Sequence, residues 1–373
     1  MAKRRANGEG SVFQRKDSRW CAKVLVNGEL RSFYGHSQQE VGDKLLTARN
    51  ANRSGAPLPR EVQKVGPFLT EWLAAVKATV RPSTHKSYSE IVTLHLEPEL
   101  GKSILAKLTP QQVQAMLARK SATPGLSPRR VQYIRAVLRM ALGRALKFGL
   151  VVRNVATLTD VPRQIRHEIQ PLGLEDARKL ITAADDDRLG PLYVLAITTG
   201  LRQGECLGLT WGCVDLDGAT VRVMRSLVRY DGAFHLDEPK TERSRRTLTL
   251  PKAAAAALRV QRARQNAERL RMGQHWQDKL GLVFTTDSGA PYHAPSAAAQ
   301  FGRFLERHGL PDVRFHDLRH SAASLLLAQG VPLRSIMEQL GHSQISLTAN
   351  LYTHIAPAML QDNANKMDAA LGS

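Results

Sequence analysis

The chain changes its side-chain pattern at one short stretch rich in proline and glycine, Arg53-Ser-Gly-Ala-Pro-Leu-Pro-Arg60. Before this stretch, residues 10–34 alternate as in β-strands, and from Pro67 the pattern turns to apolar residues at helical spacing. Proline fixes the backbone and lacks a hydrogen-bond donor, so such a stretch is typical of a linker. The 373 residues suffice for about two or three domains. We therefore expect a multidomain protein.

The distribution of charge indicates a polyanionic partner. The chain carries 53 Lys and Arg against 33 Asp and Glu, a net charge of +20, of which +16 lies in the first 160 residues. Such a surface suits the phosphates of a nucleic acid, whose neutralisation releases counterions. Aromatic residues make up only 5%, which argues against stacking of bases and favours duplex DNA over single strands or RNA.

Several other classes of protein are disfavoured. No apolar run approaches the roughly 20 residues of a membrane-spanning helix, and the basic, polar N-terminus does not resemble a signal peptide, so we expect a cytoplasmic protein without a membrane partner. Cys21, Cys206 and Cys213 match no zinc or redox spacing. There is no phosphate-binding glycine loop and no acidic grouping typical of a two-metal nuclease, so the sequence predicts no metal and no cofactor.

The opening segment predicts a three-stranded antiparallel sheet. Residues 11–15, 19–26 and 29–34 alternate in polarity, and Asn27-Gly28 is typical of a tight hairpin turn because both residues tolerate positive φ. Apolar residues at helical spacing over 38–52 predict a helix that covers one face. The other face then carries basic side chains, and Lys23 and Arg31 are our candidates for contacts with DNA.

The next segment predicts a four-helix domain, with helices over 67–78, 83–96, 110–119 and 127–148. The last of these carries six basic side chains and no acid beside an apolar stripe, which favours contact with phosphates over a merely solvated face. The candidates for DNA binding on this helix are Arg129, Arg130, Arg135 and Arg139. Beyond a second linker near 161–170 we expect a mainly helical unit with strands over 219–228 and 247–250 and a long helix over 251–271.

Four short segments of this last unit hold groups that suit phosphoryl transfer. In chain order they contain Arg202 with Glu205, His316 with Arg319 and His320, His342 after Gly341, and Tyr352 with His354. Two guanidinium forks match the geometry of the non-bridging oxygens that gain charge when an oxygen nucleophile attacks a phosphodiester. A tyrosine phenol, whose ordinary pKa is about 10, becomes a plausible nucleophile in such a cationic pocket.

The order of these segments resembles the tyrosine recombinase family, specifically phage-type integrases. The signature of that family is an arginine with an acidic residue three positions on, a lysine in a β-hairpin, His-x-x-Arg, Leu-Gly-His and Tyr-x-His. The lysine corresponds to Lys240 within Pro239-Lys-Thr-Glu-Arg-Ser-Arg-Arg246. The resemblance implies the catalytic set Arg202, Lys240, His316, Arg319, His342 and Tyr352, with Glu205, His320 and His354 in supporting roles.

The resemblance also implies a function and an organisation. The function is site-specific DNA recombination through a 3′-phosphotyrosine, which would integrate and excise phage or mobile-element DNA without metal or ATP. We expect an arm-type DNA-binding domain over 1–56, a core-binding helical domain over 63–158 and a mainly α catalytic domain with a small antiparallel sheet over 168–373. The implied partners are core-type and arm-type DNA sites, a homotetramer on DNA, an excision factor and a host DNA-bending protein, in association with a bacterial nucleoid.

Two alternatives stay open at this point. A DNA-binding regulator could keep the scaffold without the chemistry, and a relaxing enzyme of the topoisomerase type could use the same phosphotyrosine. The complete set of six catalytic positions argues against the regulator. The basic opening domain argues against the relaxing enzyme.

Overall fold

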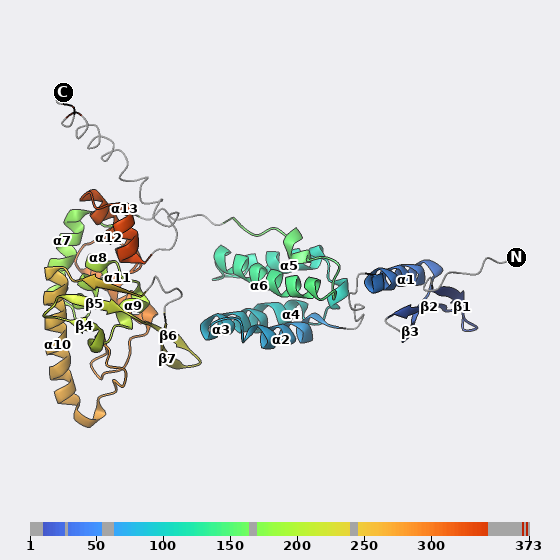
Figure 1. Cartoon of the computed structure of the whole chain (residues 1–373), viewed down its shortest axis with the longest axis horizontal. Coiled ribbons are helices and arrows are strands. Elements are labelled where there is room, and N and C mark those ends of the chain that lie inside the picture. Colours follow the sequence, from blue (N-terminus) through green and yellow to red (C-terminus); the bar gives the residue numbers. More distant parts are fainter. Residues whose placement is uncertain are drawn as a thin grey trace. The chain divides into compact units, whose positions relative to one another are not determined.

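The computed structural model describes residues 10–26, 29–53, 63–163, 170–238 and 245–341, together with Asp368 and Leu371. The chain divides into two compact units, Met1–Arg166 and His167–Ser373. Figure 1 shows their elements in chain order. The two linkers predicted from the sequence fall largely outside the described residues.

The opening sheet is antiparallel with the order β1-β2-β3, and it comprises β1 (Ser11–Gln14), β2 (Trp20–Val26) and β3 (Glu29–Gly35). Helix α1 (Gln38–Arg53) packs on one face. Alternation along β2 turns Val24 and Val26 toward that helix, where they join Ala48 in a small core. The predicted strands and helix are confirmed, each end lying within one residue of the prediction, while the predicted Asn27-Gly28 turn lies outside the described residues.

The helical segment of the first unit has a core of its own. Its helices are α2 (Val65–Val76), α3 (Pro82–Ile91), a π-helical turn η1 (Val92–Leu96), α4 (Glu97–Leu100), α5 (Pro110–Ser121) and α6 (Pro128–Lys147). Two short 3₁₀ turns accompany them, η2 (Leu105–Lys107) and η3 (Val155–Leu158). Trp72, Ile91, Met116, Ile134 and Leu138 are among the buried side chains between the helices.

Local chemistry sets the ends of these helices. Thr109 caps α5 by accepting a hydrogen bond from the Gln112 amide, and Ser127 caps α6 through the Arg130 amide. The predicted helix over 83–96 is longer than expected because it passes through η1 and runs on to Leu100. Pro98 lacks the N–H that would bond one turn back, which accounts for the change to π geometry just before it.

The second unit is built around a central helix. Figure 1 shows α8 (Gly190–Thr199) among its neighbours α7 (Leu174–Ala183), α10 (Lys252–Met272) and α12 (Asp317–Ala328). The remaining helices are α9 (Gln203–Leu207), α11 (Ala294–Arg307), α13 (Leu333–Leu340) and the 3₁₀ turns η4 (Ala184–Asp186), η5 (Trp211–Cys213) and η7 (Gly273–His275). Helix α8 is buried along nearly all of its length, and Tyr193 packs there against Phe301 and Phe304.

The described part of this unit also contains two small antiparallel sheets. One has the order β4-β5-β8, from β4 (Val214–Asp215), β5 (Thr220–Val223) and β8 (Arg246–Thr249), and the other pairs β6 (Ser226–Tyr230) with β7 (Ala233–Asp237). The prediction of a single strand over 219–228 is wrong, because the structure has two strands there. Ala219 has a φ of +47°, so it precedes the strand, and the chain changes partners after Val223 because β5 pairs with β8 whereas β6 pairs with β7. No described helix is both long enough and apolar enough to cross a membrane.

Candidate active site

Arg202 is placed by a sharp turn at the end of α8. Gly200 caps that helix in the left-handed conformation with a φ of +68°, and a Cβ at this position would collide with Leu340. Arg202 then opens α9. Glu205 accepts hydrogen bonds from the Arg202 amide at 3.0 Å and from its Nη1 at 2.7 Å, so the carboxylate fixes both the backbone and the guanidinium.

Arg319 reaches the same place from α12. Its side chain is almost completely buried, with only 2% of the residue exposed. Nη1 donates to the Gly200 carbonyl at 2.8 Å, and Nη2 donates to the Leu340 carbonyl at 2.6 Å. Arg319 thereby joins the end of α8 to the end of α13.

Three arginines from three different elements meet at the C-terminal end of α13. The last carbonyls of a helix have no partner within it, and the helix dipole makes this end negative. Here the carbonyl of Gln339 accepts from Arg246 Nε at 2.6 Å, that of Leu340 from Arg319, and that of Gly341 from Arg202 Nη2 at 3.3 Å. We call these three acceptors the α13 carbonyl triplet. They gather the guanidiniums directly before position 342.

Glu205 is the carboxylate that these arginines share. It is only 5% exposed and forms ion pairs with Arg202 at 2.7 Å and with Arg246 at 3.0 Å. Burial alone would raise its pKa, but the charges and hydrogen bonds of Arg246 and Arg202 outweigh burial and hold the pKa of Glu205 below its ordinary value. The group is therefore ionised at neutral pH and orients the arginines without exchanging protons.

The charge on Arg319 is costly to bury. Burial, and then the neighbouring guanidinium of Arg202, lower the pKa of Arg319 to about 9, while Glu205 acts in the opposite direction. At neutral pH the guanidinium still carries its proton. The described residues thus concentrate more positive than negative charge at this point, which favours an incoming anion.

His316 and His320 lie at the start of α12, with ring centroids 5.7 Å apart and planes at 84°. The His316 ring keeps an exposed surface, yet the protein around it limits its hydration. This burial, followed by the charges of His320 and Arg319, lowers the pKa of His316. Burial likewise lowers the pKa of His320. Both imidazoles are neutral at pH 7, and His316 is in a state that can accept a proton.

The structure thus brings Arg202, Glu205 and Arg319 into one cluster and places His316 one helical turn before Arg319. Four other predicted residues fall outside the described residues, namely Lys240, His342, Tyr352 and His354. The described residues reach Glu238 and Arg245 on either side of Lys240, and the described run that precedes His342 ends at Gly341. Lys240 lies between the end of β7 and the start of β8, and the chain continues from Gly341 to positions 342, 352 and 354.

The predicted DNA-binding residues of α6 differ in their surroundings. Arg129 and Arg139 are exposed, and Arg130 is partly buried. Arg135 has a structural contact, because its Nε donates to the Ala156 carbonyl at 3.0 Å and to Thr159 Oγ1 at 3.2 Å. Arg135 therefore ties α6 to η3.

The two candidates in the opening sheet lie on opposite faces. Lys23 is exposed on the face away from α1, and its ammonium lies over the Phe13 ring, 5.8 Å from the centroid. Arg31 is directly opposite Val24 on the neighbouring strand, and directly paired residues share a face. Since Val24 packs toward α1, Arg31 belongs to the helix-covered side, although its side chain is exposed at the edge of the sheet.

Arg246 is a site residue that the sequence prediction missed. In the sequence prediction it is only the last residue of the segment around Lys240. Its side chain is only 7% exposed, and it binds both Glu205 and the Gln339 carbonyl of the α13 carbonyl triplet. The signal was the alternation within β8, since Arg246 is two residues before the buried Leu248 and so shares its face.

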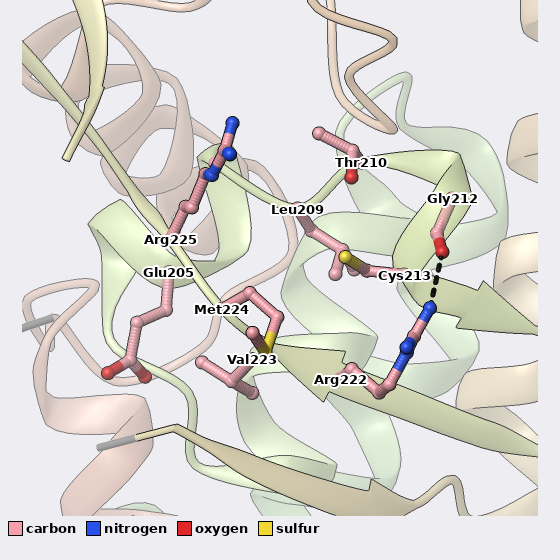
Figure 2. Close-up of a pocket in the computed structure, with 10 residues that line it drawn as sticks. Glu205, Leu209, Thr210, Gly212, Cys213, Arg222, Val223, Met224 and Arg225 are labelled. Carbon is pink, nitrogen blue, oxygen red and sulfur yellow. Dashed lines mark hydrogen bonds between the residues drawn. The ribbon is translucent and has the colours of Figure 1, made fainter. Parts of the chain in front are cut away.

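A pocket of about 400 Å³ is lined in part by Glu205, and Figure 2 shows its lining. Glu205 contributes to the wall, but its carboxylate points away from Leu209 and Cys213. Across the pocket Arg222 donates to the Gly212 carbonyl at 3.0 Å. Among the described lining residues Glu205 is the one member of the predicted site. The pocket is thus distinct from the place where the arginines converge.

Comparison with known proteins identifies the family of the chain. The sequence matches the phage integrase family over residues 172–359 and the SAM-like N-terminal domain of phage integrases over 64–121. It is 30% identical to a XerC-like tyrosine recombinase of Caldanaerobacter subterraneus, over 89% of this chain and 90% of that protein. It is also 30% identical to an integrase of Streptomyces ambofaciens, over 99% of this chain and 98% of that protein.

Solved structures share the fold. The integrase of transposon Tn1549 in complex with transposon right end DNA has a TM-score of 0.68 at 20% identity, covering 83% of this chain and all of that one. A lambda integrase tetramer bound to a Holliday junction has a TM-score of 0.56 at 16% identity, covering 89% and 95%. The chain belongs to the phage integrase family. It is a site-specific DNA recombinase of the tyrosine type.

Proposed function

We propose that this recombinase cuts and rejoins duplex DNA through a 3′-phosphotyrosine at Tyr352, with Arg202 and Arg319 stabilising the scissile phosphate. The observation that carries the proposal is the convergence of these two arginines on the end of α13. The chain leads from there to His342 and then to Tyr352, so the nucleophile is carried by a segment that starts at the arginine cluster.

The proposed reaction exchanges one phosphodiester for another. The phenolic oxygen of Tyr352 attacks phosphorus, the bond to the 5′ oxygen breaks, and a phosphotyrosine ester forms at the 3′ side. His316 accepts the phenolic proton, which its lowered pKa permits at neutral pH. Lys240 protonates the departing 5′ oxygen, and His342 donates to a phosphate oxygen. The reverse attack by a 5′ hydroxyl restores the DNA without ATP because the ester is retained.

The two arginines contribute differently in this proposal. The Arg202 side chain is 38% exposed and reaches an incoming phosphate while Glu205 orients it. Arg319 supplies a fixed charge from within the protein. Electrostatic stabilisation of this kind gains strength because the donors are already in place before the charge develops. His320, whose ring centroid lies 5.7 Å from that of His316, and His354 are assigned supporting roles.

The domain assignment follows from the distribution of charge and folds. We assign 1–56 to arm-type sites, 63–158 to the core site and 168–373 to catalysis. Exposed Arg129 and Arg139 on α6, with Arg130, would contact core DNA, and Lys23 would contact arm DNA. The linker over residues 53–60 would let one protomer bind two DNA segments, and this raises the effective concentration of the second segment. We further propose a homotetramer on two duplexes, assisted by an excision factor and a host DNA-bending protein.

A covalent-adduct assay tests the chemistry. The full chain is incubated in EDTA with nicked duplexes made from the DNA that flanks its gene, and adducts are separated on a denaturing gel. Wild type should form an adduct and Tyr352→Phe should form none, whereas Tyr230→Phe, in the β6–β7 ribbon, should behave as wild type. An adduct that survives Tyr352→Phe would refute the nucleophile. Relaxation of supercoiled DNA without strand exchange would favour the topoisomerase-like alternative, and binding without any adduct would favour the regulator.

A further inference from the structure

Arg246 occupies the centre of the arginine cluster although it carries no assigned role in the reaction. It is the first residue of β8, where it is paired with Val223 of β5. Its side chain is 7% exposed, so it meets protein on nearly every side. A buried arginine is expensive unless its donors are bonded, and its position therefore needs an explanation.

The contacts of Arg246 join three elements. Nε donates to the Gln339 carbonyl of α13 at 2.6 Å, and Nη2 donates to Glu205 Oε2 of α9 at 3.0 Å. The same carboxylate oxygen accepts from the Arg202 amide at 3.0 Å, and the other oxygen accepts from Arg202 Nη1. Arg246 therefore fixes the Glu205 carboxylate, and this carboxylate in turn fixes Arg202.

We propose that Arg246 is a positioning residue, which fixes the Arg202 guanidinium through Glu205 and holds the end of α13 against it. This inference rests on the proposed role of Arg202 at the scissile phosphate. Arg246 does not itself touch the phosphate, since its described donors are directed at protein acceptors. Its effect on the reaction passes through the geometry of Arg202.

The chemistry of the side chain explains why an arginine stands here. A guanidinium presents Nε and Nη donors in one rigid plane, so one group can bind a carbonyl and a carboxylate at fixed angles. A lysine keeps the charge but has one nitrogen on a flexible stem. It can satisfy Glu205 or Gln339 without holding both in register. Arg246→Lys thus separates charge from geometry.

The first measurement is single-turnover cleavage of a nicked core duplex by the full chain at saturating protein. With Arg246→Lys we expect the affinity for core DNA to stay near the wild-type value and the cleavage rate to fall by about 100-fold, the scale of a misplacement of about 1 Å at a reacting centre. The matched control is Arg245→Lys. Arg245 is a neighbouring, more exposed arginine paired with Glu238, so this change should leave both quantities unchanged.

A second substrate tests whether the defect passes through charge at the phosphate. A methylphosphonate at the scissile position removes the negative charge that Arg202 is proposed to stabilise. The ratio of wild-type to Arg246→Lys rates should then shrink several-fold compared with the ordinary phosphate. A purely structural loss would slow both substrates equally, and an unchanged ratio would overturn the inference.

A double-mutant comparison guards against a variant that is merely unstable. If Arg246 acts through Glu205, Arg246→Lys combined with Glu205→Gln should cleave at about the rate of the slower single variant, because both remove the same coupling. Independent, multiplicative losses would contradict the proposal. All rates are taken at a temperature at which circular dichroism shows each variant folded. Absence of any wild-type adduct would refute the proposed function itself, whereas a normal wild type with an unaffected Arg246→Lys would refute only this inference.

Discussion

Replacing Glu205 with glutamine should destabilise the second unit more than any comparable surface change. The substitution preserves shape but removes the carboxylate charge that Arg246 shares, and both side chains are nearly buried, at 5% and 7% exposure. Removing one partner of a buried ion pair costs about 3–5 kcal/mol because the remaining charge is left without compensation. We expect the lower end, about 3 kcal/mol, since glutamine retains one acceptor oxygen. The pair with Arg202 adds little, because that side chain is 38% exposed and solvent screens it.

Amide hydrogen exchange measures this loss in the full chain. The amides of α8 lie in the core of the unit, so their exchange reports its global opening. A loss of about 3 kcal/mol corresponds to exchange roughly 100-fold faster. Glu175→Gln is the control, because its pair with Arg178 at 2.9 Å is exposed, and it should cost less than about 0.5 kcal/mol. A change below about 1 kcal/mol for Glu205→Gln would refute the view that this carboxylate compensates the cluster.

The difference in free energy of unfolding between wild type and Glu205→Gln should depend on pH with a definite sign. The folded-state pKa of Glu205 is lower than its ordinary value of 4.5. Its contribution to the free energy of unfolding is therefore complete above 4.5 and is lost as the pH falls through the lower, folded-state value. The gap between wild type and Glu205→Gln should be constant near neutral pH and should narrow only in acid. A gap that widens in acid would contradict the depressed pKa.

Three further outcomes follow from the geometry. Gly200→Ala should abolish adduct formation, because a Cβ there meets Leu340 and the left-handed backbone adds strain of about 1 kcal/mol or more, so intact activity would contradict the placement of Arg202. Arg129→Ala should reduce the slope of log affinity for core DNA against log salt concentration by about one phosphate contact. Arg135→Ala should leave this slope unchanged, but it should lower the free energy of unfolding of the helical domain by about 1–2 kcal/mol, as measured by exchange of its amides. The rate of adduct formation should rise with pH as His316 loses its proton, with an apparent pKa below 6.5, the ordinary value for histidine, and should become level near neutral pH. A wild-type rate that falls over this pH range would contradict the prediction.

The sequence predicts the described elements well wherever one periodic pattern governs a segment. The opening sheet, α5, α6 and α10 all follow from local periodicity and capping residues such as Thr109 and Ser127. The strand over 219–228 was misjudged because an alternating pattern carries no information about which strand is the partner. Pairing with β8 on one side and β7 on the other is decided by the tertiary fold.

The same limit applies to the site. Motifs identify Arg202, Glu205, His316 and Arg319 through a resemblance, and their catalytic roles stay predictions. The structure brings Arg202, Glu205 and Arg319 together at the end of α13. No local pattern distinguishes Arg135 from Arg139, yet one binds backbone and the other is exposed. Alternation within β8 places Arg246 on the buried face of the strand, but it does not indicate the acceptors on α9 and α13 that the side chain binds. Whether a basic side chain faces DNA or its own protein depends on acceptors that are distant in sequence.

The α13 carbonyl triplet has a consequence for synthesis of the protein in the cell. Its hydrogen bonds connect residues 139 positions apart for Arg202 with Gly341 and 93 apart for Arg246 with Gln339. The early, basic segments, which we propose to bind DNA, leave the ribosome long before these bonds can form. The arginines are gathered only after α13 has been translated and has folded, so a chain that still lacks α13 cannot form the cluster that we propose to hold the scissile phosphate.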